Sequence, residues 1–133
     1  MTVEKNVLHV EDNSDNRLLV RRLLQAYGYG VVEAENAAKA RELINTWHPD
    51  LILMDMNMPG IDGYSLTNEI KSSPILCHIP IVAITANVMK GDRERTIRAG
   101  CDGYIEKPID IDRFIDQIES FIGPSNSIEP HML

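Results

Sequence analysis

Five short apolar runs alternate with stretches of helical periodicity along the chain, and this alternation narrows the fold more than any other feature. The runs cover residues 7–10, 31–34, 51–54, 81–84 and 104–106. Between two of them, Ala40, Leu43, Ile44 and Trp47 have the i, i+3, i+4, i+7 spacing of an amphipathic helix. Strands that alternate with helices form βαβ units. We therefore predict one α/β domain with a doubly wound parallel sheet, in which the wholly apolar run 51–54 is central.

The remaining helices are expected over residues 15–27, 64–72, 90–99 and 111–122. Asn13 or Ser14 can cap the first helix, and Asp110 can cap the last. Apolar stripes should bury the first and last helices, whereas helix 90–99 offers only Ile97 and two small residues to a core. The stripes are Val20, Leu23, Leu24 and Tyr27, and then Ile111, Phe114, Ile115, Ile118 and Ile122. Residues 124–133 have no periodicity, which predicts a domain over 1–123 and a flexible tail or linker stub.

Composition excludes several classes of partner. The chain has 133 residues, which suits one domain, and a formal net charge of −7 with a pI near 5.0. An acidic protein is poorly suited to nucleic acid or anionic membrane surfaces, so neither is expected as a partner. The sequence has no signal peptide and no apolar run of the roughly 20 residues that span a bilayer. We expect a cytoplasmic protein in which Cys77 and Cys101 remain reduced thiols.

Polar residues follow four of the five apolar runs. Glu11 and Asp12 follow the first, Asp55 follows the third, Thr85 the fourth, and Lys107 the fifth. The carboxyl ends of parallel strands lie at one edge of an open sheet, where ligands bind, so these side chains should converge. Three carboxylates suit Mg²⁺, and a lysine with a hydroxyl group can stabilise a transferring phosphoryl group.

Each of these residues also has a simpler interpretation when taken alone. Glu11 and Asp12 could simply cap a helix, where the helix dipole favours acidic residues near the N-terminus. Asp55 and Lys107 could form a structural ion pair. Thr85 by itself is uninformative, because threonine is common at strand ends. Considered together, the residues favour a site in which Asp55 is the nucleophile that forms an aspartyl phosphate.

Four segments of the chain, in order, resemble the receiver domains of two-component response regulators. They are Val-Glu-Asp-Asn (10–13), Leu-Ile-Leu-Met-Asp-Met-Asn-Met-Pro-Gly-Ile-Asp-Gly (51–63), Ile-Pro-Ile-Val-Ala-Ile-Thr-Ala (79–86) and Ala-Gly-Cys-Asp-Gly-Tyr-Ile-Glu-Lys-Pro-Ile (99–109). The resemblance covers residues 5–123 and lacks no active-site residue. It implies a (βα)5 flavodoxin-like fold with strand order 2-1-3-4-5. Residues 87–91 look more like those of single-domain and hybrid-kinase receivers.

The resemblance also implies a role for each residue of the site. Asp55 would accept a phosphoryl group from a histidine of a kinase or phosphotransfer protein. The Mg²⁺ ligands would be Asp12, Asp55, the Asn57 backbone carbonyl and, mainly through water, Glu11. Phosphate oxygens would be held by Thr85, Lys107 and the Ala86 backbone N–H. Thr85 and Tyr104 would form the switch, and Pro108 would follow a cis peptide bond.

By the same resemblance, the protein is a switch that catalyses its own phosphoryl transfer and dephosphorylation, and it is not an enzyme with a separate substrate. A downstream protein would bind the face made by helix 90–99, strand 104–106 and helix 111–122. Two features of that face have simpler interpretations. Tyr104 could be an ordinary core aromatic residue, and the basic side of helix 90–99 could simply be solvated. The helix face carries Lys90, Arg93, Arg95 and Arg98.

Three other functions fit the chain less well. A phosphatase of the haloacid-dehalogenase type carries an Asp-x-Asp motif. In this chain Asn57 occupies the position of the second Asp, and there is no cap domain. A flavodoxin-like FMN carrier needs a Ser/Thr/Gly-rich phosphate loop where this chain has Glu11 and Asp12. The third is an interaction module that leaves the acidic pocket unused.

Overall fold

The computed structural model describes residues 4–58, 63–86 and 90–125. Strands and helices alternate along the chain as predicted. The elements are β1 (Asn6–Val10), α1 (Ser14–Ala26), β2 (Gly30–Ala34), α2 (Ala37–Thr46), β3 (Leu51–Asp55), α3 (Gly63–Lys71), β4 (Ile81–Thr85), α4 (Lys90–Arg98), β5 (Gly103–Glu106) and α5 (Ile111–Ile122).

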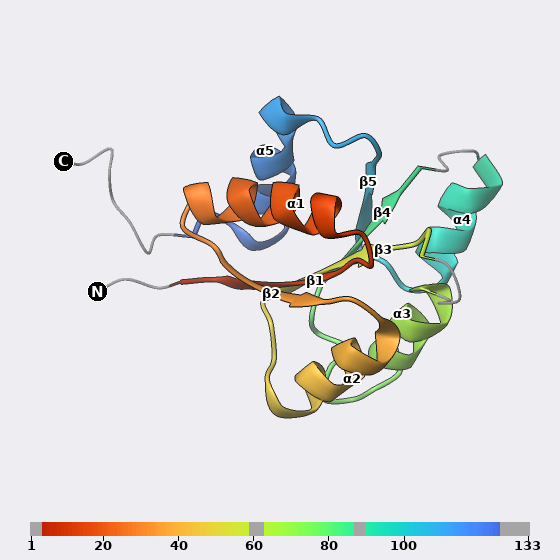
Figure 1. Cartoon of the computed structure of the whole chain (residues 1–133). Coiled ribbons are helices and arrows are strands. Elements are labelled where there is room, and N and C mark those ends of the chain that lie inside the picture. The colour runs from red at the N-terminus through yellow and green to blue at the C-terminus, as the bar shows by residue number, and fades with distance from the viewer. Residues whose placement is uncertain (1–3, 59–62, 87–89, 126–133) are drawn as a thin grey trace.

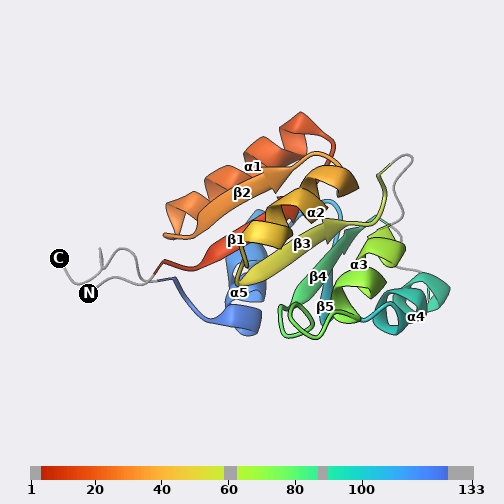
Figure 2. The same cartoon turned by 90° about the horizontal axis from the view of Figure 1, so that it is seen from below.

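The five strands form one parallel sheet in the order β2-β1-β3-β4-β5, which confirms the predicted fold. Helices α1 and α5 cover one face, and α2 and α3 cover the other, with α4 beside α3 (Figures 1 and 2). Alternate residues of β3 point to opposite faces, so Leu53 packs with α1 and α5, whereas Ile52 packs with α2 and α3. Every residue of β3 is buried, as expected for a central strand.

Two apolar residues assigned to helix stripes, Tyr27 and Ile111, lie mostly in solvent, as does Ile97, which was expected to face the core. These exposures correct the sequence analysis. Tyr27 is 57% exposed because α1 ends at Ala26 and Tyr27 already has a non-helical backbone. Ile111 is 58% exposed in the first turn of α5. Ile97 is 62% exposed, whereas the neighbouring Thr96 is buried, alone among the α4 residues whose burial the structure describes.

Ser125, two residues beyond the predicted boundary at residue 123, is buried against the domain. The Ser125 hydroxyl donates to the Gly28 carbonyl at 2.6 Å and accepts from the Lys5 N–H at 3.1 Å. The Tyr29 hydroxyl donates to the Gly123 carbonyl at 2.8 Å. Within the described ranges, no helix has the length and apolarity needed to cross a membrane.

Candidate functional site

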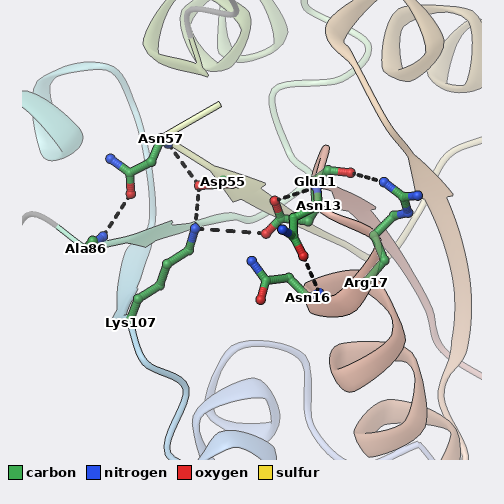
Figure 3. Close-up of polar contacts among 8 residues, drawn as sticks. All are labelled: Glu11, Asn13, Asn16, Arg17, Asp55, Asn57, Ala86 and Lys107. Carbon is green, nitrogen blue, oxygen red and sulfur yellow. Dashed lines mark hydrogen bonds and ion pairs between the residues drawn. The ribbon is translucent and has the colours of Figure 1, made fainter. Parts of the chain in front are cut away.

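The polar residues that follow the strands meet at the carboxyl edge of the sheet (Figure 3). Asp55 ends β3, Glu11 follows β1, and Lys107 follows β5. The Lys107 Nζ lies 3.0 Å from Asp55 Oδ1 and 3.9 Å from Glu11 Oε1, so it bridges the two carboxylates. Parallel pairing of β1 and β4 with β3, and of β5 with β4, places these three side chains together although they are far apart in sequence.

Three carboxylates form the acidic part of the site. Glu11, Asp12 and Asp55 each offer an oxygen atom within 4.8 Å of the others. Glu11 and Asp55 are buried, whereas Asp12 is exposed. Buried oxygen ligands beside an exposed one leave a path by which a hydrated cation can enter, and an all-oxygen set suits Mg²⁺.

The electrostatics of Glu11 support a cation at this point. Burial, followed by the hydrogen bond and the negative charge of Asp55, raises its pKa to about 7. The Asn13 N–H, 3.2 Å from Glu11 Oε2, and the charge of Lys107 oppose this rise. One lysine therefore does not offset the crowded carboxylates, so a divalent cation would relieve their repulsion. The residues present fit Mg²⁺ on these grounds.

The backbone of Asn57 contacts Asp55, and its side chain contacts the backbone of Ala86. The Asn57 N–H donates to Asp55 Oδ1 at 2.9 Å, and the Ala86 N–H donates to Asn57 Oδ1 at 2.8 Å. On the other side, Asn13 caps α1 by accepting from the Asn16 N–H, and Arg17 donates to the Glu11 carbonyl at 2.8 Å. The loop after β1 is thus fixed to α1, which holds Glu11 in place.

The residues assigned to the switch lie beside this centre. Thr85 is buried at the end of β4, and its carbonyl accepts from the Lys107 N–H at 2.9 Å. Tyr104 is half-buried on β5, and the Arg93 guanidinium lies 5.2 Å from the centre of its ring. The peptide bond between Lys107 and Pro108 is cis.

The basic face expected on α4 is only partly free for partners. Arg93 contacts Tyr104, and the Arg95 guanidinium lies 4.0 Å from the centre of the Tyr64 ring. Arg98 lies 3.7 Å from Glu94 and is mostly exposed. Residues 87–89, part of the segment compared with single-domain receivers, lie outside the described residues, as does the Lys90 side chain.

Sequence analysis missed two features near the site. His9 was counted as part of an apolar run, yet it is fully buried, and neither ring nitrogen has a hydrogen-bond partner among the described residues. Burial lowers its pKa to about 4, so the ring is neutral at pH 7. A lone histidine within an apolar strand was the available signal. The Asn57 side chain was also missed, because only its backbone carbonyl had been assigned a role.

Comparisons with known proteins agree with this geometry. Residues 7–119 match the family described as the response regulator receiver domain. The chain is 44% identical over 119 residues to the polar-differentiation response regulator DivK of Brucella ovis, covering 90% of this chain and 97% of DivK.

Two solved structures extend the comparison. The receiver domain of the sensor histidine kinase PA1611 from Pseudomonas aeruginosa, solved with a magnesium ion in its active-site cleft, is 33% identical with a TM-score of 0.81. The phosphorylated cyanobacterial phytochrome response regulator RcpA is 29% identical with a TM-score of 0.78. Both matches cover 90% of this chain, with 98% of the PA1611 domain and 94% of RcpA. With five strands in the expected order and the acidic group at their carboxyl ends, this chain belongs to the response regulator receiver domain family.

Proposed function

We propose that Asp55 accepts a phosphoryl group from a phosphohistidine of a partner kinase or phosphotransfer protein in a Mg²⁺-dependent reaction. The observation that carries the proposal is the position of this buried carboxylate, which belongs to the group of three carboxylates and lies 3.0 Å from the Lys107 ammonium. In the transfer, an Asp55 oxygen forms a bond to phosphorus while the bond from phosphorus to the histidine nitrogen breaks. Two similar proteins support the chemistry, since PA1611 holds magnesium in its cleft and RcpA was solved phosphorylated.

The ligands of Mg²⁺ in this proposal are Asp12, Asp55, the Asn57 backbone carbonyl and, mainly through water, Glu11. When bound, the ion offsets negative charge on the phosphoryl oxygens. Lys107 supplies a second positive charge, and its distance of 3.0 Å from Asp55 places the ammonium within reach of a group attached there. Thr85 and the Ala86 N–H donate hydrogen bonds to the same phosphoryl group.

The experiment that tests this function is labelling by a small phosphodonor. The protein is incubated with acetyl phosphate, with Mg²⁺ or with EDTA, and its intact mass is followed. We expect a single added phosphoryl group that requires Mg²⁺. An unused acidic pocket would give no label, and a phosphatase would hydrolyse phosphomonoesters repeatedly. Either result would contradict the proposal.

Removing Asp12 should weaken Mg²⁺ binding more than removing Glu11. Asp12 is an exposed, direct ligand in the proposal, whereas Glu11 acts mainly through water and so contributes less to the affinity. Calorimetric titration of Asp12→Asn and Glu11→Gln at pH 7 measures the order. A larger loss of affinity in Glu11→Gln would refute the assigned roles.

Phosphorylation should shift an equilibrium between two conformations of the same fold. Thr85 moves toward the phosphoryl group, and Tyr104 turns inward from its half-buried position. α4 follows because its one large apolar residue, Ile97, is exposed and does not fix it to the core. Hydrogen exchange with and without beryllofluoride, a phosphate mimic, should change most over residues 86–100. Changes confined to α1 and α2 would place the switch elsewhere.

The face made by α4, β5 and α5 is the proposed binding surface for the downstream protein. The receiver domain in this proposal covers residues 1–123, and a tail begins at residue 124. The protein acts in the cytoplasm as a switch that catalyses its own phosphorylation and dephosphorylation. Ser125, which packs against Lys5 and Gly28, would then join the tail to the domain.

A further inference from the structure

The side chain of Asn57 joins two loops at the edge of the site. Its Oδ1 atom accepts from the Ala86 N–H at 2.8 Å, across 29 residues of sequence (Figure 3). The backbone N–H of Asn57 donates to Asp55 Oδ1 at 2.9 Å, which anchors the residue beside the reacting carboxylate. Asn57 is itself exposed, so burial does not demand that its amide be paired.

The Asn57 side chain accepts from the Ala86 backbone N–H, and the proposed function needs this same N–H to bind the phosphoryl group. A backbone N–H has one proton and makes one strong hydrogen bond at a time. If Ala86 donates to a phosphoryl oxygen on Asp55, it must first leave Asn57 Oδ1. The side-chain oxygen and the phosphoryl group therefore compete for the same donor.

We propose that the Asn57 side chain is a latch, which holds the Ala86 amide in the unphosphorylated protein and is displaced when Asp55 is phosphorylated. The latch rests on the proposed function of Asp55. It joins the reacting strand to the residue that follows Thr85, on the path from β4 toward α4. Phosphorylation then replaces one bond across the site by another, so the end of β4 is held in both states by different acceptors.

The first measurement concerns the unphosphorylated protein alone. In Asn57→Ala the Ala86 N–H loses its acceptor, so its exchange with water, followed by NMR in ¹⁵N-labelled protein, should become faster. In Asn57→Asp the acceptor stays and gains a charge, so exchange should become slower than in wild type. Asn68→Ala is the matched control, because Asn68 is an exposed asparagine of α3 whose Oδ1 accepts from Ser72. Exchange at Ala86 that is the same in Asn57→Ala and wild type would overturn the latch.

The second measurement is the affinity for beryllofluoride at a Mg²⁺ concentration that saturates each variant. The bond to Asn57 must break on binding, and a net hydrogen bond corresponds to roughly a 2- to 10-fold change in an equilibrium constant. Asn57→Ala should therefore bind beryllofluoride about 2- to 10-fold more tightly than wild type and than Asn68→Ala. Unchanged or weaker binding by Asn57→Ala would overturn the latch, whereas a wild-type protein that binds no beryllofluoride would overturn the proposed function itself.

Discussion

Asp55→Asn should abolish labelling by acetyl phosphate in the presence of Mg²⁺. An amide has nearly the shape of a carboxylate but lacks its nucleophilic oxygen, so the phosphoryl group has no acceptor. The amide oxygen can still accept from Lys107 and from the Asn57 N–H, which preserves the local hydrogen bonds. Removing the charge also relieves repulsion with Glu11, so we expect the variant to fold. Intact mass then reports chemistry without a loss of structure.

Asp50→Asn is the matched control for this prediction. Asp50 precedes the same strand at its opposite end, where its Oδ2 accepts from the Asn6 N–H at 2.7 Å. This variant also exchanges one aspartate for asparagine, yet it should be labelled like the wild type. Full labelling of Asp55→Asn, or phosphate mapped to another residue, would show that Asp55 is not the acceptor.

The site could be predicted from the sequence because the topology of the sheet determines it. Once the apolar runs are recognised as parallel strands, the residue after each strand must lie at one edge, whatever the loops do. Glu11, Asp55 and Lys107 were brought together by this rule alone. Their contacts depend on strand pairing, which the apolar pattern specifies strongly.

The Asn57–Ala86 bond could not be predicted in this way. It depends on the conformations of two loops that are distant in sequence, and loop conformation has no periodic signal. The exposure of Ile97 had a similar cause. Helical periodicity assigns a residue to a face of the helix, but the neighbouring elements decide which face is buried. In α4 the buried face contains Thr96, whose hydroxyl donates to the Asp92 carbonyl at 2.8 Å.

His9→Val should stabilise the protein, and the gain should grow as the pH falls. The buried imidazole has no hydrogen-bond partner among the described residues, and such a group costs roughly 1–3 kcal/mol. Valine suits the pleated surface of a central strand. It also removes the only titrating group of β1, which lies between β2 and β3 in the sheet.

The sign of the pH effect follows from the lowered pKa. The pKa of His9 is near 6.5 in the unfolded chain, whereas burial lowers it to about 4 in the folded protein. Because of His9, the free energy of unfolding of the wild-type protein therefore falls as the pH is lowered from 6.5 toward 4, by about 3 kcal/mol in total. His9→Val escapes this loss, so the difference in stability between the two proteins widens over that range.

Glu11 acts in the opposite direction and must be separated from His9. Its pKa is raised from 4.5 to about 7, so the folded protein binds this proton first, and stability rises as the pH falls through that interval. Both proteins contain Glu11, so its effect cancels to first order in their difference. Urea unfolding in EDTA at pH 7.5, 6 and 5 measures that difference, and His48→Gln, which changes an exposed histidine, should show none. Stability curves that stay parallel for wild type and His9→Val would mean that the buried ring takes up its proton as easily in the folded chain as in the unfolded one.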